Sequence, residues 1–201
     1  MPRRRSRRYR LLKRSLDVVL SLLLLVMTMP FSALVALLIR WNMGAPVVFR
    51  QRRPGLGGRP FTLLKFRTMS IDGREVPVLG RRLRALSLDE IPQLWNVLRG
   101  DMALVGPRPL LMEYLPRYSD EQARRHEVTP GMTGWAQVNG RNAVNWHTQF
   151  QLDVWYVDHA SIALDVRILF LTVLRCLRRD GGEANSAADR APFNGKPLQP
   201  D

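Results

Sequence analysis

The feature that most constrains this chain is an apolar run near its amino terminus, from Val18 to Ile39, that contains no charged residue. As one continuous helix it would be about 33 Å long, and the hydrocarbon core of a bilayer is about 30 Å thick. A buried helix of this length is seldom needed in a domain of this size. No A-x-A-like cleavage site follows the run, so an export signal is not expected. The run therefore predicts a membrane anchor.

Two further features bear on how the anchor sits in a membrane. Pro30 lies inside the run, where it removes one backbone hydrogen bond and its ring collides with the carbonyl of Val26, so the helix should bend or break there. Arginines crowd the front edge of the run, and Arg40 and Arg50 follow the back edge. Basic flanks are preferentially kept in the cytoplasm, so both ends favour the same side. The residues alone leave two models open, a re-entrant helix and a kinked transmembrane span.

The charge of the chain indicates which partners it attracts. Its formal net charge of +14 favours phosphates, whether in anionic lipid, a diphosphate substrate or nucleic acid. Much of the basic excess lies in the arm before the anchor, where an anionic phospholipid membrane explains it. No helix-turn-helix or RNP-like pattern is present, so nucleic acid is not expected as a partner, although a membrane-tethered nucleic-acid-binding module is the alternative. The single cysteine, Cys176, excludes an internal disulfide and is expected to be buried.

The rest of the chain is expected to form one small α/β domain. Short apolar runs at 47–49 and 61–66 flank a turn-rich loop, which predicts two strands of a hairpin. A helix is expected to start at Ser87, with a capping box closed by Glu90, and to end at Gly100. Further helices are expected at about 119–127 and 163–177, the second on a membrane surface or against the anchor.

Asp89 and Glu90 are adjacent carboxylates in the expected first turn of that helix, where free backbone N–H groups favour negative charge. A plain capping box would explain them without any chemistry. However, a cluster of arginines can hold anionic oxygens beside carboxylates, and one surrounds the pair: Arg81, Arg82, Arg84 and Arg99. This combination is typical of a phosphoryl-transfer site. Asp89 is the candidate nucleophile, because a carboxylate can attack phosphorus once cations screen the repulsion between like charges.

The same acidic pair is the candidate metal site. Mg²⁺ suits a site built from carboxylate and diphosphate oxygens, so Asp89 and Glu90 are the expected ligands. A zinc site is not expected. Zinc ligands follow a recognisable spacing, which is not found among the three histidines of the chain, His126, His147 and His159.

Four further cations could contact phosphate. Lys65 and Arg67 lie one residue apart, so on a strand they would share a face and could reach one phosphate. Arg108 and Arg141 each follow a glycine-bearing turn, which lets the backbone and the guanidinium approach one anion. Each of these patterns also occurs at ordinary solvent-exposed lysines and arginines, so none of the patterns is specific on its own.

Several motifs follow one another along the chain, and as an ordered series they are far more specific than any one of them. They are Arg52-Arg53-Pro54-Gly55, Lys65-Phe66-Arg67-Thr68-Met69, Ser87-Leu88-Asp89-Glu90, Gly106-Pro107-Arg108-Pro109 and Pro130-Gly131-Met132-Thr133-Gly134-Trp135-Ala136-Gln137-Val138-Asn139-Gly140-Arg141. The series resembles the bacterial sugar transferases, the monotopic phosphoglycosyl transferases, over roughly 8–181. It looks most like the small enzymes that start protein N-glycan or polysaccharide assembly, including those acting on UDP-diacetylbacillosamine.

The resemblance implies a monotopic membrane protein whose re-entrant helix breaks at Pro30, with the active site at the cytoplasmic face of the bacterial inner membrane. It also implies transfer of a sugar-1-phosphate from a UDP-sugar to polyprenyl (undecaprenyl) phosphate in two steps. Asp89 would carry a covalent phosphosugar after UMP is released. Glu90 would support magnesium or the attacking phosphate, and Arg84 would hold the lipid phosphate.

Further site residues are implied by the same resemblance. Lys65, Arg108 and Arg141 would contact the nucleotide sugar. Asp165, in a family-like stretch, is another site candidate that could instead cap its helix.

The chain is expected to divide into a basic arm and re-entrant helix at 1–40, a catalytic domain at 41–181 and a flexible tail at 182–201. A homo-oligomer is a further possibility. The segment 70–86 is shorter than expected for the family, which leaves the identity of the sugar open.

Overall fold

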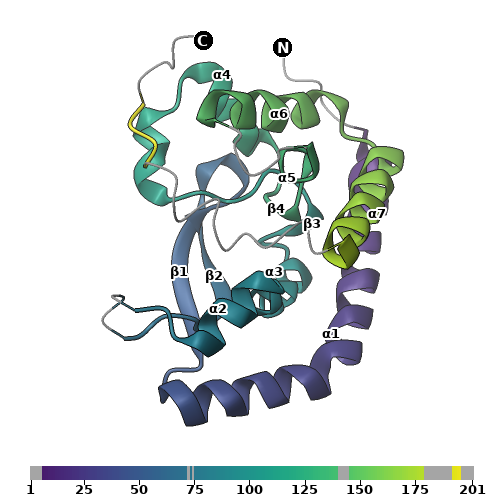
Figure 1. Ribbon diagram of the computed structural model, residues 1–201. Helices are drawn as coiled ribbons and strands as arrows, with labels where there is room; N and C mark the ends of the chain where they lie inside the picture. Colours follow the sequence, from purple (N-terminus) through teal and green to yellow (C-terminus); the bar gives the residue numbers. More distant parts are fainter. Residues whose placement is uncertain (1–5, 72, 74, 140–144, 179–191, 196–201) are drawn as a thin grey trace.

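The structure is a computed structural model that describes residues 6–71, 73, 75–139, 145–178 and 192–195. It combines a long amino-terminal helix, a β-hairpin, a small parallel sheet and shorter helices (Figure 1). The α-helices are α1 (Arg7–Met43), α2 (Val78–Ala85), α3 (Gln93–Arg99), α4 (Asp120–Ala123), α5 (Trp135–Asn139), α6 (Trp146–His159) and α7 (Ile162–Arg178). The strands are β1 (Val48–Pro54), β2 (Pro60–Phe66), β3 (Ala103–Val105) and β4 (Gly131–Thr133). The 3-10 turns are η1 (Leu56–Gly58), η2 (Leu88–Glu90), η3 (Met112–Arg117) and η4 (Arg124–Glu127).

Helix α1 bends at its proline. It starts after Ser6, whose side chain accepts a hydrogen bond from the backbone N–H of Tyr9 at 3.2 Å. Figure 1 shows two limbs, one beside α7 and one below the hairpin and α2. Pro30 lies inside the helix and explains the bend, because it cannot donate to the carbonyl of Val26 and its ring crowds that carbonyl. The predicted bend is therefore confirmed.

The apolar surface of α1 is largely uncovered. Among the residues that the structure describes, α1 is the one helix long and apolar enough to cross a membrane, and only 11% of its most apolar stretch is buried inside the protein. A helix in the core of a soluble protein would be covered by its neighbours, so this surface is compatible with contact to lipid. Its exposed apolar side chains include Leu22, Leu23, Val26, Met27, Met29, Phe31, Leu34 and Leu37.

Strands β1 and β2 form the predicted antiparallel hairpin. Their register pairs Phe49 with Lys65 and Arg53 with Phe61. Directly opposed side chains lie on the same face of a hairpin, and every second residue of a strand shares that face. Gln51, Arg53 and Lys65 therefore lie on one face.

Helix α3 joins the hairpin to the anchor. The buried side chain of Asn96 accepts a hydrogen bond from the N–H of Leu64 at 3.0 Å and donates one to the carbonyl of Thr62 at 2.7 Å, so it binds the free edge of β2. At the end of the same helix, Arg14 of α1 donates to the carbonyl of Val97 at 2.6 Å. The same guanidinium donates to the carbonyl of Leu98 at 2.6 Å, and these contacts help to satisfy the carbonyls at the helix end.

The main core lies between the first limb of α1, α3, the parallel pair β3–β4, α6 and α7. Strands β3 and β4 pair Ala103 with Gly131 and Val105 with Thr133. The buried side chains of this core are Leu63, Leu94, Val97, Met102, Leu104, Val105, Val128, Val138, Tyr156, Val157 and Ile168. The core therefore ties the anchor to the elements that carry the site.

Helix α7 matches the helix predicted at 163–177. Its Asp165 accepts hydrogen bonds from Lys13 of α1 at 2.9 Å and from the hydroxyl of Tyr156 at 2.7 Å, so it docks α7 on the anchor. The helix leaves Phe170 and Val173 exposed. The expectation that Cys176 is buried was wrong, because this thiol lies on the exposed side of α7.

Part of the predicted flexible tail, at 192–195, packs against the rest of the protein. Phe193 is only 3% exposed and packs against the rings of Tyr114, Tyr118 and Phe150, which lie 5.0 to 5.7 Å away between ring centroids. Arg117 fixes the same residue by donating to its carbonyl at 2.6 Å. The remainder of the predicted tail, 182–191 and 196–201, lies outside the described residues.

Candidate active site

The adjacent acids lie on the turn η2, between α2 and α3. Ser87, just before them, has a φ of 54° in the left-handed region, and its side chain makes no capping bond. The predicted capping box is therefore wrong. Pro92 gives the reason: it has no N–H to continue a helix from Leu88, so α3 begins only at Gln93. As predicted, the helix ends at Gly100.

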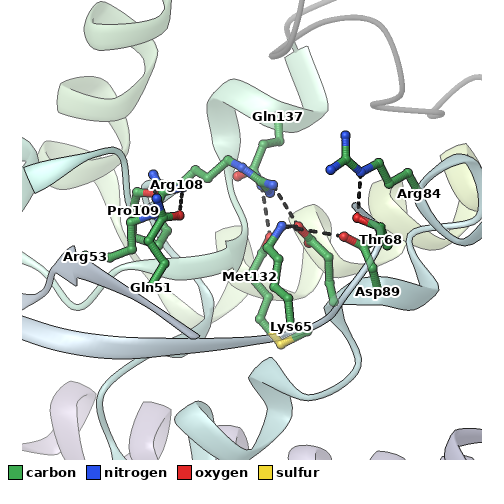
Figure 2. Close-up of polar contacts among 11 residues, drawn as sticks. Gln51, Arg53, Lys65, Thr68, Arg84, Asp89, Arg108, Pro109, Met132 and Gln137 are labelled. Atoms are coloured by element: carbon green, nitrogen blue, oxygen red, sulfur yellow. Dashed lines mark hydrogen bonds and ion pairs between the residues drawn. The ribbon is translucent and has the colours of Figure 1, made fainter. Parts of the chain in front are cut away.

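Glu90 is held by two cations. Its Oε1 accepts hydrogen bonds from Lys65 of β2 and from Arg108, the latter at 2.7 Å. Figure 2 labels both cations. Burial alone would raise the pKa of this carboxyl, but Arg108 and Lys65 outweigh it and lower the pKa to about 2. Glu90 is therefore a fixed anion that positions two cations.

Asp89 has a different environment from its neighbour. Its side chain is buried, and among the described residues its one ion pair is with Lys65, whose Nζ lies 3.9 Å from its Oδ2. Burial raises the pKa of Asp89, and the charge of Glu90 adds to the rise against the opposing effects of Lys65, Arg108 and Arg84. A desolvated carboxylate without strong hydrogen bonds is suited to attack an electrophile.

Arg84 approaches Asp89 from α2. Its Nε donates to the hydroxyl of Thr68 at 2.8 Å, which leaves the rest of the guanidinium directed away from Thr68 (Figure 2). The helix can lie this close because residue 80 is glycine: a Cβ on Gly80 would fall 2.0 Å from the carbonyl oxygen of Thr68. Arg84 is among the cations that lower the pKa of Asp89. The structure thus brings this predicted residue to the site.

Arg108 is carried by a loop that packs tightly on the segment after β4. A Cβ on Gly134 would fall 2.2 Å from the carbonyl oxygen of Gly106, so the two segments can touch only through glycine. Behind the loop, the buried side chain of Arg125 donates to the carbonyl of Arg108 at 2.7 Å and to Asp153 at 2.7 Å. The position of Arg108 is therefore fixed from both sides.

Arg67 does not join this site. Strand β2 ends at Phe66, so Arg67 does not share a strand face with Lys65. Its guanidinium is buried and donates to the carbonyl oxygens of Met43, Gly44 and Ala45, where α1 ends. The prediction that Lys65 and Arg67 reach one phosphate is therefore wrong, because the open carbonyls at the end of α1 hold Arg67.

Two other predicted residues are not placed in the site. Arg141 lies outside the described residues, so its prediction stays untested. Asp165 neither caps α7 nor meets the acidic pair, since Lys13, Tyr9 and Tyr156 surround its carboxylate. It belongs to the contact between α1 and α7.

The structure adds residues that were not singled out from the sequence. Arg53 and Gln51 lie on the face of the hairpin that also carries Lys65, and Gln137 of α5 points toward the same region (Figure 2). Gln137 donates to the carbonyl of Met132 at 2.9 Å, and its buried Oε1 has no hydrogen-bond partner among the residues that the structure describes. The register of the hairpin could have predicted that Arg53 lies near the site, because the register follows from the sequences of the two strands.

The acidic pair offers carboxylate oxygens that suit magnesium. Proteins hold Mg²⁺ by one or two carboxylates together with substrate phosphates and water. Asp89 can offer an oxygen, and Glu90 can offer its second oxygen, because only Oε1 is engaged by Lys65 and Arg108. In the described part of the chain no group of three or more acidic, histidine or cysteine residues gathers to hold a metal. The donor set therefore suits a metal shared with a diphosphate.

Comparisons with known proteins identify the family of this chain. The family model of the bacterial sugar transferases matches residues 8–179. The chain is 50% identical over 195 residues to EpsL of Bacillus subtilis, named an uncharacterized sugar transferase, with 92% of this chain and 96% of that protein covered. It is 38% identical over 199 residues to the UDP-galactose-lipid carrier transferase of Erwinia amylovora, covering 86% and 42%. The undecaprenyl-phosphate galactose phosphotransferase of Salmonella typhimurium is 37% identical over 203 residues, covering 88% and 42%.

The chain spans less than half the length of the relatives from Erwinia amylovora and Salmonella typhimurium. The family model nevertheless matches most of the length of this chain. The chain belongs to the bacterial sugar transferase family.

Proposed function

We propose that this chain is a membrane-bound phosphoglycosyl transferase that moves a sugar-1-phosphate from a UDP-sugar to polyprenyl phosphate and releases UMP. The observation that carries the proposal is the contrast between the two acids: Glu90 is neutralised by Lys65 and Arg108, whereas Asp89 is buried with a raised pKa. The names of the relatives, which mention a lipid carrier or undecaprenyl phosphate, support this substrate class.

In the first step, a carboxylate oxygen of Asp89 attacks the β-phosphorus of the UDP-sugar. A new P–O bond forms, and the bond from that phosphorus to the oxygen bridging the two phosphates breaks. The electron pair leaves with the bridging oxygen, so UMP departs and the sugar-1-phosphate remains on Asp89 as an acyl phosphate. Lys65, which lies 3.9 Å from Asp89, offsets the repulsion between the carboxylate and the diphosphate.

In the second step, an oxygen of polyprenyl phosphate attacks the same phosphorus. The bond to Asp89 breaks, its carboxylate is restored, and the product is a polyprenyl diphosphosugar. The attacking oxygen is already deprotonated, so this step needs no general base. Arg84, held by Thr68 beside Asp89, is placed to offset the charge of the incoming phosphate.

Glu90 positions cations in this mechanism. Its Oε1 fixes Lys65 and Arg108, which come from different parts of the fold. This role is compatible with a role as a metal ligand, because a carboxylate has a second oxygen that could bind a metal while Oε1 holds both cations.

Magnesium is part of the proposal. When bound, it would neutralise charge between the carboxylate and the diphosphate. Asp89 and the diphosphate oxygens would hold it, and the two cations on Glu90 would stay in place.

The proposal includes the membrane. Both limbs of α1 would enter one leaflet from the cytoplasmic face of the inner membrane, because basic residues flank both ends and the helix bends at Pro30. The exposed apolar side chains of α1 would face lipid, and the basic arm would lie against anionic headgroups. This arrangement places the site where a water-soluble donor and a lipid acceptor can both reach it.

A single-turnover experiment tests the function. Purified protein mixed with a panel of UDP-sugars, without lipid, should release about one UMP per chain and gain the mass of a sugar phosphate on the peptide that contains Asp89. Adding polyprenyl phosphate should remove the adduct. Asp89→Asn should give neither UMP nor adduct, and Asp120→Asn, an exposed carboxylate on α4, should behave as the parent. Turnover by Asp89→Asn at the parent rate would overturn the assignment.

A further inference from the structure

Arg53 is a cation near the site to which the mechanism gives no role. Its Nε and Nη2 donate to Oε1 of Gln51 at 3.1 and 2.7 Å, and its Nη1 donates to the carbonyl of Pro109 at 3.4 Å (Figure 2). Pro109 directly follows Arg108, so the guanidinium of Arg53 lies against the backbone of the loop that carries Arg108. Both partners of Arg53 are neutral oxygens.

The electrostatics of this pair of arginines are unbalanced. Glu90 pairs with Arg108, but in the described part of the chain no carboxylate pairs with Arg53. Burial and then the charge of Arg108 lower the pKa of Arg53 to about 10. Two guanidinium groups whose charges repel each other, one of them without a paired carboxylate among the described residues, form a place where an added anion would bond to both.

The order of the charged residues across the site indicates which anion would bind to Arg53 and Arg108. Arg53 lies beyond Arg108 as seen from Asp89, and Arg84 lies at the other end (Figure 2). Displacement at phosphorus is roughly in line, so the leaving group lies opposite the attacking oxygen. The departing nucleotide must therefore extend away from Asp89, and among the described residues the cations beyond Lys65 on that path are Arg108 and Arg53.

We propose that Arg53 and Arg108 together bind the phosphate of the nucleotide, which leaves as UMP. Gln51 and the carbonyl of Pro109 hold the guanidinium of Arg53 in the orientation that meets this phosphate. The inference rests on the proposed function for the identity of the nucleotide. It makes Arg53 a substrate-binding residue for the donor.

The test compares UMP with uridine, which lacks the phosphate, as ligands of the full chain in detergent or lipid nanodiscs. Arg53→Gln should weaken UMP binding by about tenfold, the usual value of one hydrogen bond to a charged group, and leave uridine binding unchanged. Arg53→Lys should recover part of the loss, because it keeps the charge without the planar fork. The KM for the UDP-sugar should rise in the same order.

The matched control is Arg52→Gln, which removes an exposed arginine from the opposite face of the same strand. It should leave UMP affinity unchanged. Unchanged UMP affinity in Arg53→Gln would overturn the inference. So would an equal loss for UMP and uridine, since that result indicates a purely structural role. Because binding needs no turnover, the measurement can succeed even if no adduct forms on Asp89, so the two proposals fail separately.

Discussion

Arg108 donates a hydrogen bond to Oε1 of Glu90 across 2.7 Å, and Lys65 donates to the same oxygen. One carboxylate thereby joins the loop before η3 to the strand β2. Because Glu90 takes both cations, Asp89 is left as the less paired of two adjacent acids. The different roles of the two acids follow from their partners, since their positions in the chain are nearly equivalent.

The first prediction concerns this shared oxygen. Glu90→Gln and Arg108→Gln should each lower kcat/KM for UMP release by about a hundredfold, because a cation displaced by about 1 Å loses its effect on the transition state. The double variant should be little worse than either single variant, since the residues act as a unit. Arg99→Gln, which removes an arginine whose side chain is 62% exposed, is the control and should be neutral. Independent, additive losses would contradict the coupling.

The second prediction concerns pH. Burial and the neighbouring charge of Glu90 raise the pKa of Asp89 above the ordinary aspartate value of 3.8. Only the carboxylate attacks phosphorus, so the single-turnover rate of UMP release should fall as the pH is lowered, with a midpoint above 3.8. Glu90, whose pKa is lowered to about 2, stays ionised in that range and does not contribute.

A variant of Lys65 checks the origin of this midpoint. Lys65 lowers the pKa of Asp89, so Lys65→Met should move the midpoint to higher pH while reducing the rate. Stopped-flow or quenched-flow measurement of UMP gives both quantities. A midpoint that does not move, or one below the ordinary aspartate value, would show that another group controls the rate.

Parts of this fold could be predicted because they depend on residues close in sequence. The hairpin follows from two short apolar runs and a glycine-rich turn, and the bend in α1 follows from Pro30 alone. The acidic pair was recognised because Asp89 and Glu90 are adjacent and arginines surround them in sequence. Such features need no knowledge of tertiary contacts.

Contacts between residues that lie far apart in the sequence could not be predicted. Arg67 is directed away from the site by the open carbonyls at the end of α1, more than twenty residues earlier in the chain. Phe193 is fixed by an aromatic cluster drawn from η3 and α6, which a polar tail composition does not reveal. Ser87 is an exception, because the reason is local. It does not cap a helix, since Pro92 lacks the N–H that would continue a helix from Leu88.

The third prediction concerns the buried end of the tail. Phe193→Ala should lower the free energy of unfolding by about 3–5 kcal/mol, because it leaves a cavity among Tyr114, Tyr118 and Phe150. Phe193→Leu should cost less and keeps the test informative if the alanine variant does not fold. Denaturant unfolding of the protein in detergent measures both. Ile71→Ala, at a side chain that is 78% exposed, is the control, and an equal cost there would contradict the packing role of Phe193.

The fourth prediction concerns topology. After Cys176, which is exposed, is replaced by serine, single cysteines can be placed at the exposed positions Arg10 and Asn42, near the two ends of α1. A membrane-impermeant maleimide should label both from the cytoplasmic side and neither from outside, because the two limbs would leave the same face. Labelling of the two positions from opposite sides would defeat the re-entrant model and favour a kinked span. Pro30→Leu restores a donor for the carbonyl of Val26, and a straight helix of this length, about 55 Å, exceeds the thickness of the hydrocarbon core. In that variant, a fraction of the molecules should therefore expose one end of α1 on the outside of the membrane. This result would show that the topology depends on a single missing hydrogen bond.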